Sequence, residues 1–104
     1  MSEAASRLRK ALLERVVQAK AKTTPAARRQ AFDNRDVPEA ARALLDKVAN
    51  HAWKVTDEDV AAARAAGLSE DQIFELVACT AFGHSARQLE AALAALAVAT
   101  QEPR

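Results

Sequence analysis

The hydrophobic positions of this chain recur at helical spacing, and no segment alternates with the period of two that is typical of a β-strand. Near the amino terminus, one face of a predicted amphipathic helix over about residues 3–20 gathers the apolar side chains Leu8, Leu12, Leu13, Val16 and Val17. We therefore expect an all-α protein.

Two further helices are predicted in the first half. Thr24 fits an N-cap and Pro25 the first helical position, so a brief helix runs to Phe32. Asp36 can cap the next helix, which Pro38 opens and which ends near Trp53. The predicted inner face of this helix consists of Ala41, Leu44, Leu45, Val48 and Ala52.

The second half carries two capping-box patterns. Thr56 precedes Asp59 by three residues, and Ser69 precedes Gln72 by three. Gly67 suits the left-handed stop between them. The sequence thus predicts a short helix over about residues 57–66 and a long helix over about residues 70–97.

The long helix has two different apolar faces. Its first half is apolar around Ile73, Leu76 and Val77, and its second half around a stripe rotated by roughly 150°, which consists of Phe82, Leu89, Leu93 and Leu96. Either the helix bends near Gly83, a weak point in any helix, or it is buried on two sides between its own domain and a partner. Both interpretations predict oligomer contacts along this helix.

Composition favours one small domain completed by self-association. The 104 residues are half hydrophobic, but alanine dominates, with only three Phe, one Trp and no Tyr. Such a core buries little area for each apolar position. We expect a single orthogonal or antiparallel domain of about five helices over residues 1–104, with a core over 38–97, that forms a homo-oligomer: a dimer, trimer or hexamer.

Charge is divided unevenly along the chain. Residues 1–30 carry eight basic and two acidic side chains, whereas residues 31–104 carry seven basic and twelve acidic ones. The basic amphipathic arm over residues 1–24 either lies across an acidic body, its own or a neighbour's, or is a solvated helix face. Nucleic-acid binding is not expected, because the arm lacks interleaved aromatic side chains for stacking.

The single cysteine and the absence of long apolar runs indicate a reduced, cytoplasmic protein. One cysteine cannot form a disulfide within the chain, and basic residues precede only Leu12 and Leu13 near the amino terminus. Charges interrupt every stretch that approaches the roughly 20 apolar residues of a membrane span. No glycine-rich phosphate loop is present, so no cofactor is predicted. Two histidines without ligand-like spacing predict no metal site.

Three residues of the long helix are candidates for catalysis. Cys79 has apolar neighbours that raise a thiol pKa, and an ionised Glu75 one turn earlier would raise it further. We interpret Cys79 as a packing residue, with a nucleophile as the alternative. His84 projects about 140° from Cys79, which disfavours a local dyad and suggests a core or interface histidine. Glu75 is either a general acid or base with a raised pKa, or a capped or ion-paired carboxylate.

Two further residues are candidates for substrate binding. His51 lies at the edge of the predicted third helix and could approach the long helix if the two pack antiparallel. Arg87 forms either an ion pair, at the surface or between subunits, or an anion-binding fork in a pocket.

Four segments carry a resemblance to a known family. They are Ala43-Leu44-Leu45-Asp46-Lys47, Val55 to Val60, Leu68 to Val77, and Phe82 with Ala86, Arg87 and Leu89. Together they resemble the second half of the carboxymuconolactone decarboxylase and AhpD-like superfamily, over about half the chain. The resemblance implies an all-α domain that assembles into trimers or hexamers.

The resemblance also limits the chemistry. Alkylhydroperoxidase members of that superfamily use a Cys-x-x-Cys pair and a histidine in the first half, but here no cysteine or histidine precedes Pro38. Decarboxylase members lack the redox pair and act on a small lactone acid. One hypothesis is therefore a non-redox structural or interaction module, alone or beside a paralogous subunit. The other is a peroxidase-like or decarboxylase-like enzyme with a pocket between subunits, lined by Glu75, Cys79, His51, His84 and Arg87.

Overall fold

The protein is all-α in the part of the chain that the structure describes. The computed structural model describes residues 7–8, 10–11, 14–15 and 21–101, and no strand occurs among them. The elements are α2 (Pro25–Asp33), α3 (Glu39–His51), the 3₁₀ turn η1 (Ala52–Lys54), α4 (Asp57–Ala65) and α5 (Glu70–Gln101). Most of the predicted helix over residues 3–20, and of the basic arm, lies outside the described residues.

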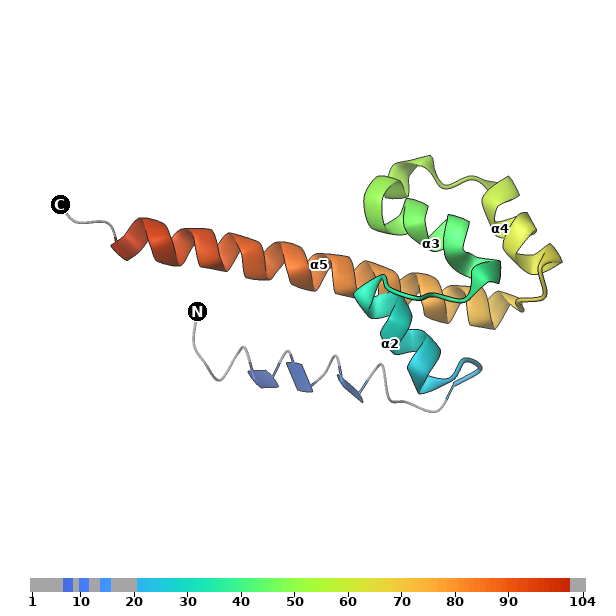
Figure 1. Ribbon diagram of the computed structural model, residues 1–104, viewed down its shortest axis with the longest axis horizontal. Helices are drawn as coiled ribbons and strands as arrows, with labels where there is room; N and C mark the ends of the chain where they lie inside the picture. Colours follow the sequence, from blue (N-terminus) through green and yellow to red (C-terminus); the bar gives the residue numbers. More distant parts are fainter. Residues whose placement is uncertain (1–6, 9, 12–13, 16–20, 102–104) are drawn as a thin grey trace.

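The long helix α5 is the axis on which the other helices are arranged. In Figure 1, α2 crosses one side of α5, and α3 and α4 pack on the other side near its amino-terminal half. With 32 residues, α5 is about 48 Å long. Its carboxyl-terminal turns project beyond α2, α3 and α4 (Figure 1).

Local capping sets the helix boundaries, as the sequence predicts. The Thr24 hydroxyl accepts a hydrogen bond from the Ala27 amide at 3.1 Å, with Pro25 at the first helical position. The capping boxes begin α4 and α5: Thr56 and Asp59 bond reciprocally, and the Ser69 and Gln72 amides each donate to the other side chain, at 2.9 and 3.1 Å.

The stop signals of α2 and α4 are also in place, whereas the predicted start signal of α3 is not. Gly67 has φ of 112°, and Asn34 closes α2 in the left-handed region at 52°. Asp36, predicted as a cap, is instead left-handed at φ 56°, because the chain turns there, and α3 follows Pro38 without a side-chain cap.

Two other boundary predictions are wrong. The α-helix α3 ends at His51 and the chain tightens into η1, so Ala52 leaves the predicted inner face and is exposed, while Ala49 is 3% exposed in its place. The long helix continues to Gln101 instead of ending near Ala97, since no breaking residue intervenes.

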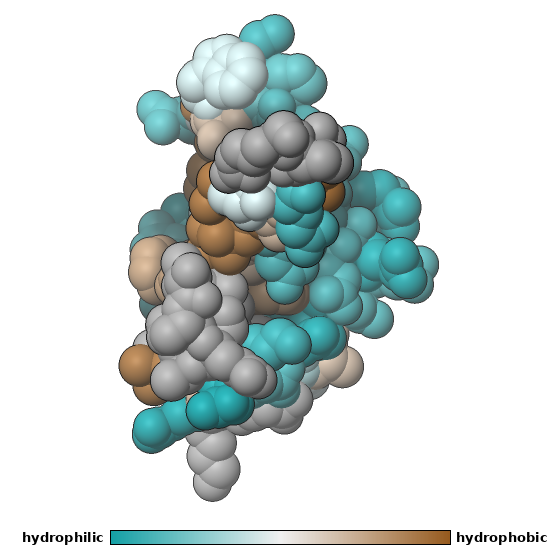
Figure 2. Space-filling model, turned by 90° about the vertical axis from the view of Figure 1, so that its left-hand side faces the viewer, coloured by the Kyte–Doolittle hydropathy of each residue, from teal (hydrophilic) through white to brown (hydrophobic). Residues whose placement is uncertain are grey.

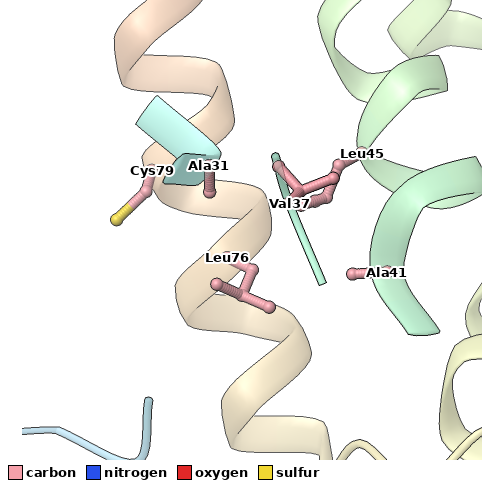
Figure 3. Packing of buried hydrophobic residues seen from close by; sticks show 6 residues of the cluster. All are labelled: Ala31, Val37, Ala41, Leu45, Leu76 and Cys79. Atoms are coloured by element: carbon pink, nitrogen blue, oxygen red, sulfur yellow. The ribbon is translucent and has the colours of Figure 1, made fainter. Parts of the chain in front are cut away.

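Two hydrophobic clusters hold the helices together, and α5 contributes to both. The larger cluster joins α2, the α2–α3 connector, α3 and α5 (Figure 3) and consists of Ala31, Val37, Ala41, Leu45, Leu76 and Cys79. The second joins α3, α4 and α5 through Leu44, Ala63 and Ile73. Four of the ten buried hydrophobic residues described are alanines, so close approach replaces side-chain bulk in this core.

The closest approach is between the end of α2 and the middle of α5. A Cβ atom added to Gly83 would lie 1.7 Å from the carbonyl oxygen of Phe32. The glycine therefore allows contact between two backbones. Of the two predicted alternatives, the bend near Gly83 does not occur, because α5 is one continuous helix through this point, without a sharp kink (Figure 1). Leu76 is buried as predicted, while Phe82 and Leu96 on the second stripe are 45% and 58% exposed.

Replacing this glycine by alanine tests the contact. An exposed Gly→Ala change in a helix stabilises it by about 1 kcal/mol. Gly83→Ala should instead lower the free energy of unfolding by about 2 kcal/mol or more, because the Phe32 backbone must move away. Urea unfolding followed by circular dichroism measures the difference, with Glu90→Ala, at another exposed α5 position, as the control. A neutral or stabilised Gly83→Ala would contradict the observed packing.

Candidate functional site

A polar cluster joins the segment before α2 to α5. The Glu75 carboxylate accepts hydrogen bonds from the backbone amides of Lys22 and Thr23, at 2.9 and 2.8 Å, and from the Thr23 hydroxyl at 2.6 Å. Arg28 completes this group, which we call the Glu75 cluster: Lys22, Thr23, Arg28 and Glu75. A carboxylate of α5 is thereby tied to residues more than 50 positions earlier in the chain.

Arg28 is the site residue that the sequence did not predict. It is only 2% exposed, and its guanidinium donates to the Thr23 carbonyl at 2.5 Å and to the Thr23 hydroxyl at 3.2 Å. The available signal was its spacing, since it lies three residues before Ala31 on the buried face of α2. A charged residue at that position suggests a solvated face, so spacing alone does not reveal its burial.

The surroundings of Glu75 favour its charged form. Burial acts to raise the pKa of Glu75, but the hydrogen bonds from the Thr23 side chain and from the Lys22 and Thr23 amides, with the charge of Arg28, outweigh it. The pKa of Glu75 therefore lies below its usual value. This direction is opposite to the raised pKa expected for a general acid or base, and it agrees with a carboxylate held by hydrogen bonds, close to the predicted alternative of a capped or ion-paired glutamate.

Cys79 is a core residue next to this cluster. It is 2% exposed and belongs to the larger hydrophobic cluster, with its sulfur pointing away from α3 (Figure 3). Burial raises the pKa of the Cys79 thiol, the charge of Arg28 opposes that rise, and the charge of Glu75 adds to it. The predicted burial and the predicted direction of the pKa are confirmed, so the thiol form prevails at neutral pH.

Neither histidine is hydrogen-bonded to Cys79 among the described residues. His84 is half-buried on α5, and no hydrogen bond of the described residues joins it to Cys79. His51 is exposed at the end of α3, where its ring packs edge-on against Trp53 with centroids 5.4 Å apart and planes at 68°. The structure thus gives His51 an aromatic neighbour at the end of α3.

Arg87 forms a hydrogen bond with the backbone of α2. Its guanidinium donates to the carbonyl oxygen of Phe32 at 2.7 Å, and no ion pair joins it to a carboxylate of the described residues. That carbonyl belongs to the last turn of α2, where main-chain acceptors lack helical partners. Arg87 therefore satisfies the end of α2 at the point where Gly83 lets it approach.

An open depression lies on another face of α5. It has a volume of about 270 Å³ and is lined by Ala78, Ala81, Phe82 and Ser85. None of the five predicted site residues is among these, and the Ser85 hydroxyl is the one polar side-chain group that they contribute. Among the residues described, no group of three or more His, Cys, Asp or Glu side chains could hold a metal ion.

Comparison with protein-family models, with curated proteins and with solved structures finds no match to this chain. Within the described part of the chain, no helix combines the length and the apolar character needed to cross a bilayer.

The Glu75 cluster makes stability depend on pH. Glu75→Gln should lower the free energy of unfolding by about 1–2 kcal/mol at pH 7, because an amide is a weaker acceptor for three donors. Since the pKa of Glu75 is lowered on folding, the wild-type advantage is present above the usual pKa of about 4.3 and is lost as pH falls through the folded value.

Urea unfolding between pH 7 and pH 3 measures this dependence. Glu90→Gln, at an exposed glutamate of the same helix, is the matched control and should change stability little at any pH. A Glu75→Gln deficit that stayed constant down to pH 3 would show that the carboxylate charge is not what the cluster uses.

Proposed function

We propose that this protein is a non-redox helical interaction module of the carboxymuconolactone decarboxylase and AhpD-like type, acting as a homo-oligomer. The observation that carries the proposal is that three potentially reactive side chains of α5 make structural contacts within the fold. Glu75 fastens the segment before α2, Arg87 satisfies the end of α2, and Cys79 fills the core. The face of α5 left open to a partner is apolar around Phe82 and Leu96.

The thiol of Cys79 is poorly suited to peroxide reduction. Attack on a peroxide needs a thiolate that is exposed and has a low pKa, whereas Cys79 is buried and its pKa is raised. The chain also has no second cysteine to resolve a sulfenic acid. Both properties support a packing function for this residue.

The alternative is an enzyme of the same superfamily, peroxidase-like or decarboxylase-like, with a pocket between subunits. The observation that favours it is the open depression beside Phe82 and Ser85, which a second subunit could close into a cavity. Against it, the described lining supplies no titratable group, and Glu75 and Arg87 are engaged within their own chain.

Thiol reactivity and turnover distinguish the two functions. In the native protein, Cys79 should react with a disulfide reagent at least about 100-fold more slowly than in urea, because labelling requires opening of the core. Wild type and Cys79→Ala should show the same background rate with an alkyl hydroperoxide. Rapid native labelling, together with hydroperoxide turnover that Cys79→Ala abolishes, would overturn the proposal.

A further inference from the structure

One face of α5 follows a seven-residue repeat. Beginning at Ala78, apolar or small side chains recur at alternating spacings of four and three residues, the spacing of a helix seam that packs against a second helix. We call these positions the seam: Ala78, Phe82, Ser85, Leu89, Ala92, Leu96 and Ala99. They span 22 residues of a helix that is continuous throughout.

The seam is exposed and carries no charge. Phe82 is 45% exposed, Leu96 is 58% exposed and Leu89 is half-buried. Between Ala78 and Ala99, the charged residues of α5 are Arg87 and Glu90. At 100° per residue, both lie on the side of the helix away from the seam. The positions that flank the seam are also uncharged: Ala81, Ala86, Gln88, Leu93, Ala95 and Thr100.

Figure 2 shows the end of the molecule from which α5 projects. Hydrophobic residues are visible in the middle and towards the left of this view, and hydrophilic residues cover its right-hand side. Large apolar side chains exposed along one helix face, as Phe82 and Leu96 are, mark an interaction surface.

The depression on α5 has the shape that a second helix requires. Its lining residues Ala78, Ala81, Phe82 and Ser85 stand at positions i, i+3, i+4 and i+7. Four residues at that spacing form the hole that one side chain of a packed helix enters. The lining of the depression is therefore compatible with the packing of a second helix against this face.

The sizes of the seam residues identify the partner as a second copy running in the opposite direction. Large side chains stand at every seventh position, Phe82, Leu89 and Leu96, and small ones occupy the positions between them. In a parallel pair, each seam residue faces the same residue of the second copy. Layers of two large side chains then alternate with layers of two small ones. Reversing one helix sets each large side chain against a small one, and every layer has a similar volume, as close packing requires.

We propose that two copies of this chain pair through antiparallel α5 helices along the seam. In the register with the longest overlap, Phe82 faces Ala92 of the second copy, Ser85 faces Leu89, and Ala78 faces Leu96. Each copy thereby covers the depression of the other. This inference rests on the proposed function, because it specifies how the module associates with itself.

The expected dimer is weak and reversible. An overlap of 29 residues is about 43 Å long, and a helix is about 10 Å wide, so each copy contributes a strip of about 400 Å². That is about half the area of a standard interface. The dimer should therefore dissociate at micromolar concentrations, which sedimentation equilibrium over a range of protein concentrations can follow.

Disulfide crosslinking tests the direction and the register. In a Cys79→Ala background, we introduce Ala78→Cys in one sample and Leu96→Cys in another. In the proposed pair, equivalent cysteines lie about 27 Å apart, far beyond disulfide reach, so neither variant alone should crosslink. The 1:1 mixture should form a covalent dimer on mild oxidation, because position 78 faces position 96.

The other outcomes each overturn the pairing. Crosslinking of each variant with itself would indicate parallel helices. Absence of crosslinks in the mixture would mean a different register, or that the seam is covered otherwise, for example by residues 1–20 of the same chain. Neither result would bear on the proposed non-redox function, which depends on an unreactive Cys79. A reactive Cys79 would overturn that function without affecting the crosslinks.

A charged residue introduced into the seam gives an independent test of the dimer, because the substitution leaves the hydrophobic core of the chain unchanged. Leu96 lies on the projecting part of α5, so Leu96→Glu should fold normally by circular dichroism. It should raise the dimer dissociation constant by at least about 100-fold, because two carboxylates enter apolar layers. Ala97→Glu adds the same charge on the far side and should change it less than about 2-fold. Equal effects of both variants would overturn the seam.

Discussion

The contact between α2 and α5 is the constraint on which the rest of this structure depends. It is fixed at both ends. At one end the Glu75 carboxylate holds the residues that precede α2, and at the other Gly83 admits the carbonyl of Phe32, to which Arg87 donates. The larger hydrophobic cluster lies between these two points. A thin, alanine-rich core gains definition in this way from backbone approach and directed hydrogen bonds.

This contact also determines what α5 can do chemically. Glu75 and Arg87, two of the polar side chains that would be candidates for a functional role in an isolated helix, are engaged in positioning α2. A carboxylate held by three donors in its charged form is a poor proton carrier near neutral pH, and a buried thiol beside it is a poor nucleophile. What remains accessible on α5 is an apolar face, and apolar surface serves association.

The parts of this structure that local sequence specifies could be predicted, and the parts that need distant partners could not. Thr24, Thr56 and Ser69 cap helices through residues three positions away, so their pattern is visible in the sequence. The partner of Glu75 lies 52 positions away, and only the tertiary packing brings it near. From the sequence, Gly83 indicates only a weak point in the helix, because the hydrophobic pattern contains no sign that another backbone lies against it. The buried position of Arg28 was hidden for the same reason.

The two apolar faces of α5 were visible from periodicity alone, and the fold explains one of them. The face around Ile73 and Leu76 packs against the chain's own helices. The seam follows a period of 3.5, whereas a straight helix has 3.6 residues per turn, so the seam drifts by about 20° per heptad. Over the three heptads from Ala78 to Ala99 the drift is about 60°, which is less than the width of about 100° of an apolar helix face. In the proposed pair, two nearly straight α5 helices would therefore stay in contact along the whole seam.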